Sequence, residues 1–545
     1  MHQPSVSRQT ANHWVPWLAV ATALPVLVAG LVTFGRFDGL YGQDAFAYYD
    51  YAVGPLRAAV SALQTPPPFT WPPGYPLLVA LASFVAGITP RAGQWVSLLA
   101  GAATPIFTGL LAYQVWSVND GLDGERAPSP SSTPMSAGWA GRCPRLTLCV
   151  PLLAGLLAAL AGQLWQSSVV VMSDTTGLAA ATLGAWALAS YGRRDARRSV
   201  TWLLLAAGAL AYAVQTRWAY ALVAVPFTAY ALLVLARRGP AIAVKHGLAA
   251  AVVTLLVMTP VLVPAIRSLA HPAGADVPFA IDLQVYSWNP LNAFRREFVT
   301  ADGLLSYSRP NGVYYALAPG SRLFFTPLLA PLLLPGLWSV VRRRAAAPLL
   351  IVAGWAVVIF LFHAGAPWQN IRFNLAHLPP LAILIAVGVE AIAGRLGRIE
   401  HGTWRRLALG LLAAYLAIGM AFMAYSGRAL MRGFVIRKDH DLAVVRQVEE
   451  RTPADAQLLA FGLTLTLQHY AQRTTYELYY QDGDSLATLL ASDRPLYLLL
   501  DVANAESQWP GLRPEENYTW LQEHAVLTNV ADLEPFTLFA VDEEP

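Results

Sequence analysis

Asp44 stands in a stretch of unusual composition near the start of the chain. Aromatic residues surround it, namely Tyr41, Phe46, Tyr48 and Tyr49. The segment Trp71-Pro72-Pro73-Gly74-Tyr75-Pro76 follows soon afterwards. A carboxylate can accept the proton of an attacking hydroxyl group, and it can also bind a divalent cation. The alternative is a solvated carboxylate that caps a helix beginning at Ala45.

A second acidic residue, Asp174, follows an apolar run and precedes another one. An ionisable residue at such a membrane boundary is a functional candidate, although Ser173 or Asp174 could simply cap the next helix. Arg217 and Arg372 are isolated cations between apolar runs. A guanidinium group binds two phosphate oxygens at once, and the alternative is an arginine that reaches lipid headgroups.

Arg372 lies in the turn Pro367-Trp368-Gln369-Asn370-Ile371-Arg372-Phe373, which begins shortly after His363. The imidazole of His363 could carry a proton, or it could simply sit at the membrane interface. Asn370 would present its amide beside Arg372. We expect this turn to contribute to a substrate site.

The composition identifies the class of protein that must position these residues. Of 545 residues, 56% are hydrophobic and 13% are charged, whereas a soluble domain carries about 25% charged residues. The chain is therefore expected to be a polytopic α-helical membrane protein. The net charge of +4 is small, and we expect no nucleic-acid partner. Cys143 and Cys149 form neither a disulfide framework nor a metal-ligand spacing.

Eleven apolar runs are candidates for membrane spans. They comprise residues 14–34, 92–118, 146–162, 175–191, 199–216, 218–236, 247–266, 323–341, 345–362, 373–389 and 407–426. Residues 74–88 form a shorter run that begins with prolines, and we expect it to lie at the outer membrane surface without crossing. The alternative is a true span, which would place Asp44 on the inner side. The two domains would be residues 1–436, with an outer loop at 35–91, and residues 437–545.

Arginines mark one face of this membrane domain. Four basic clusters are each separated from the next by two apolar runs, at residues 193–198, 237–245, 342–344 and 395–406. Short loops rich in Lys and Arg are cytoplasmic. Asp44, Asp174, Arg217, Arg372 and the C-terminal region then lie on the outer face of a plasma membrane.

The composition changes after about residue 437, where charged residues become frequent and apolar runs shorten. Strands are predicted at 457–461, 474–478, 495–501 and 536–541, and helices at 439–451, 463–470, 485–492 and 514–523. Strands that alternate with helices indicate a small α/β domain. It carries no catalytic motif, so we expect it to have a supporting or substrate-positioning role.

The order and spacing of Asp44 and the Trp71–Pro76 segment resemble the first outer loop of the GT-C glycosyltransferases. Asp174 and Arg372 also resemble this family's pattern, most closely in the protein O-mannosyltransferase and aminoarabinose-transferase group. The resemblance implies a polyprenyl-phosphate sugar donor and a lipid, glycan or protein acceptor. Asp44 would be the catalytic base, and Arg372 with Arg217 would bind the donor phosphate from the opposite end of one cavity.

The resemblance further implies a set of substrate-binding residues, namely Asp174, Trp71, Tyr48, Tyr49, Asn370 and His363. Direct displacement would invert the sugar centre. A divalent cation is a candidate cofactor, although the family often has a second acidic residue at the position of Ala45. The alternative function is a membrane transporter or lipid flippase. It would require polar residues at mid-membrane, broken helices and a repeat between the two halves.

Overall fold

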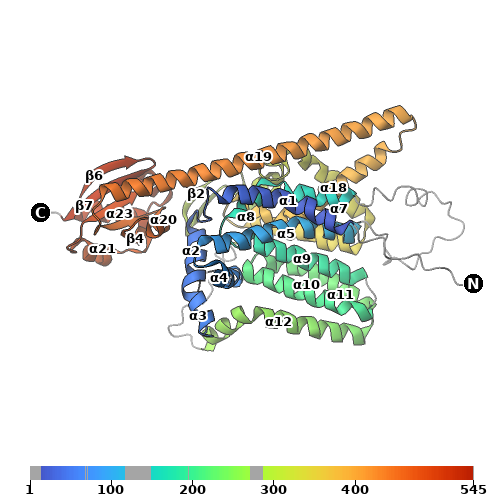
Figure 1. Ribbon diagram of the computed structural model, residues 1–545, viewed down its shortest axis with the longest axis horizontal. Helices are drawn as coiled ribbons and strands as arrows, with labels where there is room; N and C mark the ends of the chain where they lie inside the picture. Colours follow the sequence, from blue (N-terminus) through green and yellow to red (C-terminus); the bar gives the residue numbers. More distant parts are fainter. Residues whose placement is uncertain are drawn as a thin grey trace, which may run out of the picture.

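The computed structural model describes residues 14–67, 69, 71–116, 149–193, 196–270 and 287–543. Most of these residues are helical, and the long helices lie side by side along the long axis of the molecule (Figure 1). A small domain of strands and short helices lies at one end (Figure 1). This architecture confirms the predicted polytopic α-helical protein with a small C-terminal α/β domain.

Eight helical segments among the described residues are long and apolar enough to cross a membrane. They are α1 (Val15–Phe34), α5 (Pro90–Trp116), α10 (Ala196–Thr216), α11 (Tyr220–Arg237), α12 (Pro240–Ala270), η7 with α17 (Pro348–Gly354, Trp355–Gly365), η8 with α18 (Ile371–His377, Leu378–Leu396) and α19 (Gly402–Arg451). The helices α7 (Cys149–Ala159) and α8 (Gly162–Val169) make a ninth if their 56° bend lies within one span.

Two predicted spans differ from these, so the predicted count of eleven is not confirmed within the described residues. Helix α9 (Asp174–Arg193) is long, but it is rich in Ala, Gly and Thr because it is packed on nearly all sides by protein, including α5 and α10. Residues 323–341 are not one helix. They form the short segments α15 (Thr326–Leu329), η6 (Ala330–Leu332) and α16 (Leu333–Arg343), and prolines at 327 and 331 begin two of them.

Several short elements gather at the end of the bundle that faces the C-terminal domain (Figure 1). They are α2 (Gln43–Tyr51), η2 (Ala52–Leu56), α3 (Arg57–Ser61), α4 (Gly74–Ala86), η4 (Pro290–Phe294), the hairpin β1–β2 (Glu297–Thr300, Gly303–Ser306), α14 (Asn311–Leu317) and η5 (Ala318–Gly320). The 13 residues of α4 extend about 20 Å, less than the roughly 30 Å of a hydrocarbon core. This length is compatible with the prediction that residues 74–88 do not cross.

The C-terminal domain is a five-stranded sheet with helices around it. Its elements are β3 (Gln457–Ala460), α20 (Thr464–Tyr470), β4 (Thr474–Glu477), η9 (Leu478–Tyr480), α21 (Gly483–Leu490), β5 (Leu496–Leu500), α22 (Val502–Gln508), α23 (Arg513–His524), β6 (Ala525–Leu533) and β7 (Phe536–Glu543). The strand order is β4-β3-β5-β7-β6. The pairs β3–β4 and β3–β5 are parallel, whereas β7 is antiparallel to β5 and β6. Helix α22 and strand β6 were not predicted.

Helix α19 joins the two parts without a break at residue 437 (Figure 1). Its last turns contribute Val444, Val445 and Val448 to the core on one face of the sheet. A continuous helix that is anchored in the domain core holds the domain against the bundle.

The C-terminal domain also contacts the elements around Asp44 directly. The side-chain amide of Gln43 donates to the carbonyl of Gly462 (3.3 Å), and the Tyr470 hydroxyl donates to the Asp38 carboxylate. Asp44 and the C-terminal domain therefore lie at the same end of the bundle, as predicted.

Candidate functional site

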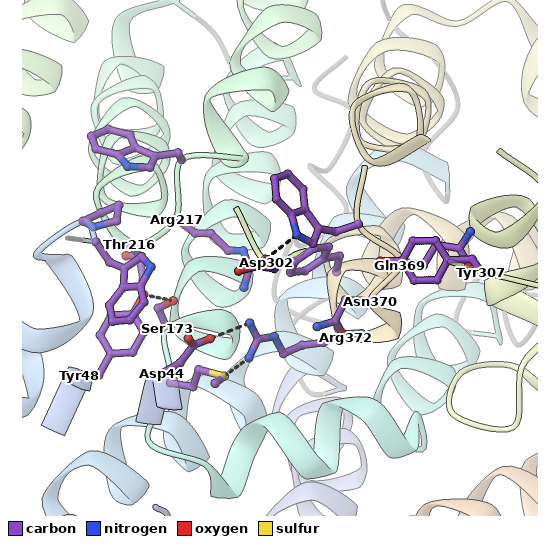
Figure 2. A pocket seen from close by; sticks show the side chains of 16 residues that line it. Asp44, Tyr48, Ser173, Thr216, Arg217, Asp302, Tyr307, Gln369, Asn370 and Arg372 are labelled. Carbon is purple, nitrogen blue, oxygen red and sulfur yellow. Dashed lines mark hydrogen bonds and ion pairs between the residues drawn. The ribbon is translucent and has the colours of Figure 1, made fainter. Parts of the chain in front are cut away.

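A cavity of about 450 Å³ opens at this end of the bundle. It is bordered by α2, the Trp71 segment, the turn before α9, the turn after α10, the β1–β2 hairpin and the turn before η8 (Figure 2). Its charged and hydrogen-bonding lining residues are Asp44, Tyr48, Trp71, Ser173, Thr216, Arg217, Trp218, Asp302, Tyr307, Trp368, Gln369, Asn370 and Arg372.

Four charged residues form one network beside this cavity. Nη2 of Arg372 lies 2.9 Å from Oδ2 of Asp44 (Figure 2). Nε of Arg372 lies 3.6 Å from Oδ2 of Asp174, and Arg217 forms an ion pair with the other oxygen of Asp174. Asp174 thus joins the two arginines, and Arg372 joins the two aspartates. The predicted placement of Asp44 and Arg372 at opposite ends of the cavity is wrong, because they are in direct contact.

Asp174 supports the network from below the cavity surface. Its side chain is only 3% exposed, whereas those of Arg217 and Arg372 are 21% and 25% exposed. It is also the first residue of α9, where the helix dipole favours a negative charge. A buried carboxylate between two partly exposed guanidinium groups fixes the positions of both cations.

A few buried contacts bring the Asp44 loop to the turn before α9. The carbonyl of Gly39 accepts a hydrogen bond from Val171 N (2.9 Å). The buried Gln94 amide donates to the carbonyls of Phe37 (3.1 Å) and Val169 (2.9 Å), one on each side of this junction. Gly39 has φ +99° and a Cβ there would collide with Gln94, so the close approach requires glycine.

The Trp71–Pro76 segment approaches the end of α10 through its glycine. A Cβ on Gly74 would lie 2.8 Å from the carbonyl oxygen of Gln215, and Tyr212 donates to the Gly74 carbonyl (2.8 Å). This contact places Trp71 beside Thr216 and Arg217 at the cavity. The glycine of this motif is therefore explained by its close approach to α10, and the Tyr75 hydroxyl bonds instead to Gly93 and Ser97 of α5.

Tyr48 and Trp71 form an aromatic wall of the cavity. Their rings stack with centroids 5.0 Å apart, and the Tyr48 hydroxyl is 3.1 Å from that of Ser173 (Figure 2). Burial raises the pKa of Tyr48 to about 12. Its hydroxyl therefore stays protonated at ordinary pH and acts as a hydrogen-bonding group.

Three predicted substrate-binding residues do not line the cavity, namely the buried Asp174 described above, Tyr49 and His363. Tyr49 is buried and packs against His469 of the C-terminal domain, with ring centroids 5.8 Å apart. His363 is buried between the rings of Tyr315 and Phe373, at 5.5 and 5.3 Å. Both residues lie one layer behind the cavity, where they support the elements that line it. The predicted Asn370 does line the cavity, and its side chain accepts a hydrogen bond from Arg372 N (3.0 Å).

Asp302 is a cavity residue that the sequence did not reveal. It lies in the turn of the β1–β2 hairpin, and its carboxylate accepts a hydrogen bond from Trp368 Nε1 (2.6 Å). Its backbone carbonyl accepts another from Gln508 of α22 (2.7 Å). A hydrogen bond from the C-terminal domain therefore fixes the hairpin residue Asp302 at the cavity, opposite the aromatic wall (Figure 2).

These residues fit a divalent cation poorly. The carboxylates of Asp44 and Asp174 are both paired with guanidinium groups. Among the described residues, no group of three or more His, Cys, Asp or Glu side chains is arranged to hold a metal ion. Positive charge at this site is supplied by Arg217 and Arg372.

The fold can be compared with known proteins. No family model matches the chain, and no curated protein matches it in sequence. Two crystal structures of ArnT from Cupriavidus metallidurans, one bound to undecaprenyl phosphate and one in the apo state, each align with 97% of this chain and 98% of their own. Both have a TM-score of 0.57 and 14% identity.

Two larger structures match in part. The S. cerevisiae protein O-mannosyltransferase Pmt1-Pmt2 complex bound to the sugar donor aligns with 56% of this chain and 42% of its own (15% identity, TM-score 0.35). Arabinosyltransferase EmbB from Mycobacterium smegmatis aligns with 80% of this chain and 42% of its own (14% identity, TM-score 0.42). The full-length agreement with ArnT establishes a common fold.

Proposed function

Because the chain has the GT-C fold that it shares with ArnT, we propose that it is an integral-membrane glycosyltransferase. It would transfer a sugar from a polyprenyl-phosphate-linked donor to an acceptor hydroxyl of a lipid, glycan or protein. One observation carries the proposal: the Asp44–Arg372 pair lies within a cavity where apolar helices end. An amphiphilic donor suits this place, since its tail stays in lipid while its phosphate and sugar reach the charged groups.

The donor phosphate would bind to Arg372 and Arg217. Arg372 meets Asp44 through Nη2 and Asp174 through Nε, so a phosphate can replace Asp44 while Asp174 still holds the guanidinium group. Asp174 pairs with Arg217 in the same way. The two cations would stabilise the negative charge that develops on the departing phosphate.

Phosphate binding would release Asp44 for the acceptor. The acceptor oxygen forms a bond to the anomeric carbon while the bond from that carbon to the phosphate oxygen breaks. The bonding electrons leave with the phosphate, and the hydroxyl proton passes to Asp44. A direct displacement of this kind inverts the anomeric centre. Tyr48 and Trp71 offer ring faces to a sugar, and Asn370 and Asp302 offer hydrogen-bonding groups on the other side of the cavity.

We further propose that the cavity and the C-terminal domain face the outside of the plasma membrane. The basic clusters at residues 342–344 and 395–406 lie at the last turns of α16 and α18 and the first turn of α19, at the other end of the bundle, which is the cytoplasmic end by the distribution of Lys and Arg. Single cysteines at Gln43 and Gln481 should both react with an impermeant reagent in intact cells. Labelling of only one position would overturn the shared orientation.

The function is tested with purified protein in nanodiscs and a panel of polyprenyl-phosphate sugars. Wild-type protein should release polyprenyl phosphate and form a glycosylated acceptor. Arg372→Lys retains a charge but loses the planar fork, so it should weaken donor binding, and Arg372→Ala should weaken it more. Donor-sugar movement across the membrane without any transfer would support the transporter alternative and contradict the proposal.

A further inference from the structure

A second cavity, of about 440 Å³, lies at the opposite end of α18 from Arg372. The 12 residues of α18 from Leu378 to Val389 lie between the turn of Arg372 and the first α18 residue of this cavity, Glu390, a length of about 18 Å at 1.5 Å per residue. The cavity is formed where the ends of α5, α16 and α18 meet, and it shares no lining residue with the first cavity. It is therefore a separate site.

Trp116, the last residue of α5, organises the floor of this cavity. Its indole Nε1 donates to the Glu390 carboxylate, and its carbonyl accepts a hydrogen bond from Arg343 (3.3 Å). The Arg343 guanidinium also lies over the Trp116 ring, 4.2 Å from its centroid. These contacts hold one carboxylate and one guanidinium group in fixed positions.

Three further arginines line the cavity, namely Arg342, Arg395 and Arg398. Within the part of the chain that the structure describes, their side chains form no ion pair or side-chain hydrogen bond. Four guanidinium groups and one carboxylate give the lining a formal net charge of +3. Convergent arginines of this kind bind phosphate oxygens well.

An apolar stripe leads along α16 to this cavity. Leu334, Leu337, Trp338 and Val341 are 42–73% exposed and follow the spacing i, i+3, i+4 and i+7, so they share one face of the helix. The opposite face is pressed against α18, since a Cβ on Gly336 or Gly388 would collide with backbone of the other segment. In a membrane the stripe faces lipid, and it ends at Arg342.

We propose that this cavity binds the phosphate headgroup of an anionic phospholipid whose acyl chains lie along the α16 stripe. Basic pockets between membrane helices are suited to anionic headgroups, and an exposed tryptophan such as Trp338 is suited to the interface. The arginines supply the phosphate site, and the stripe distinguishes a lipid from a soluble phosphate. Glu390 restricts which anionic headgroups fit, because its carboxylate repels any negative group that reaches the cavity floor. The lipid phosphate is therefore expected beside the arginines and away from Glu390.

Gly394 allows the cavity to be filled without a change of charge. It lines the cavity, and a Cβ there meets no atom within 4 Å. Gly394→Leu should therefore fold normally and obstruct the headgroup site. Gly410→Leu is the matched control, because Gly410 is also helical, also open and outside the cavity.

The charge of the site is tested separately. Arg395→Gln with Arg398→Gln removes two cavity cations, and Arg405→Gln with Arg406→Gln removes two exposed cations outside the cavity. Delipidated protein is titrated with dioleoylphosphatidylglycerol, and binding is measured by native mass spectrometry. Dioleoylphosphatidylcholine and glycerol phosphate are the comparison probes.

We expect the Arg395/Arg398 pair to weaken phosphatidylglycerol binding at least about tenfold, the effect of one lost charge-assisted hydrogen bond. Gly394→Leu should also weaken it, because the added side chain occupies the headgroup site. Both controls should bind like wild type. Equal losses in the Arg405/Arg406 control would show a diffuse surface effect and overturn the proposal. Equal binding of phosphatidylcholine, or equal competition by glycerol phosphate, would overturn the anionic or the lipid part of it.

Discussion

Replacement of Asp174 by asparagine should destabilise the protein more than any other neutralisation at the cavity. Asp174 is 3% exposed and is paired with both Arg217 and Arg372. Removal of one partner of a buried ion pair costs roughly 3–5 kcal/mol. Both guanidinium groups are one-fifth to one-quarter exposed, so water restores part of their hydration. We therefore expect a loss of about 3 kcal/mol in the free energy of unfolding.

The loss is measured by unfolding in mixed micelles of increasing SDS content, followed by circular dichroism. Asp302→Asn is the control, since Asp302 lines the same cavity but is exposed and accepts one side-chain hydrogen bond, from Trp368. The double variant Asp174→Asn with Arg217→Gln should recover part of the loss, because it removes one of the two uncompensated cations. An Asp174→Asn protein as stable as Asp302→Asn would refute this reasoning.

Two further changes test how the cavity is built. Gly303→Ala should loosen the β1–β2 hairpin, because Gly303 has φ +85° and a Cβ would collide with the Gln508 carbonyl. Faster amide hydrogen exchange in residues 297–306 is expected. Gly511→Ala is the control, because Gly511 also has a positive φ (+68°) but has open space around it. An equal increase of exchange in residues 297–306 of this control would exclude the collision as the cause. Tyr48→Phe keeps the stack on Trp71 and should lower transfer only severalfold. Burial raises the pKa of Tyr48 to about 12, so the rate of transfer should depend on alkaline pH in the same way in wild type and Tyr48→Phe. A fall in the wild-type rate below about pH 10 that is absent in Tyr48→Phe would show that the hydroxyl titrates there.

Periodicity and charge spacing predicted most of the membrane helices because lipid-facing helices must be apolar throughout. The run predicted at residues 175–191 is a helix, α9, but it faces protein on nearly every side, so small residues replace the large apolar ones that are typical of a span. Prolines divide residues 323–341 into short segments. In the C-terminal domain, β6 was missed because it is a mostly exposed edge strand whose apolar and polar residues do not alternate.

The candidate site was only partly predictable for a similar reason. Asp44, Asp174, Arg217 and Arg372 are uncommon because each is a charge beside an apolar run, and the structure brings all four together. Asp302 lies in a long segment between predicted spans, where an aspartate is common and does not indicate a functional site. Its position depends on Gln508, which is 206 residues away in the chain. Such a long-range contact leaves no trace in local sequence.

The most direct test of the central claim is single-turnover transfer by Asp44→Asn, measured together with donor affinity in nanodiscs. The amide keeps the shape of the side chain but cannot accept the acceptor proton. Turnover should fall by roughly 10² to 10⁴. Donor affinity should be unchanged or higher, because Arg372 no longer pairs with a carboxylate at position 44. Wild-type turnover would remove Asp44 from the chemistry, and a collapse of donor binding would contradict the assignment of the phosphate to Arg372.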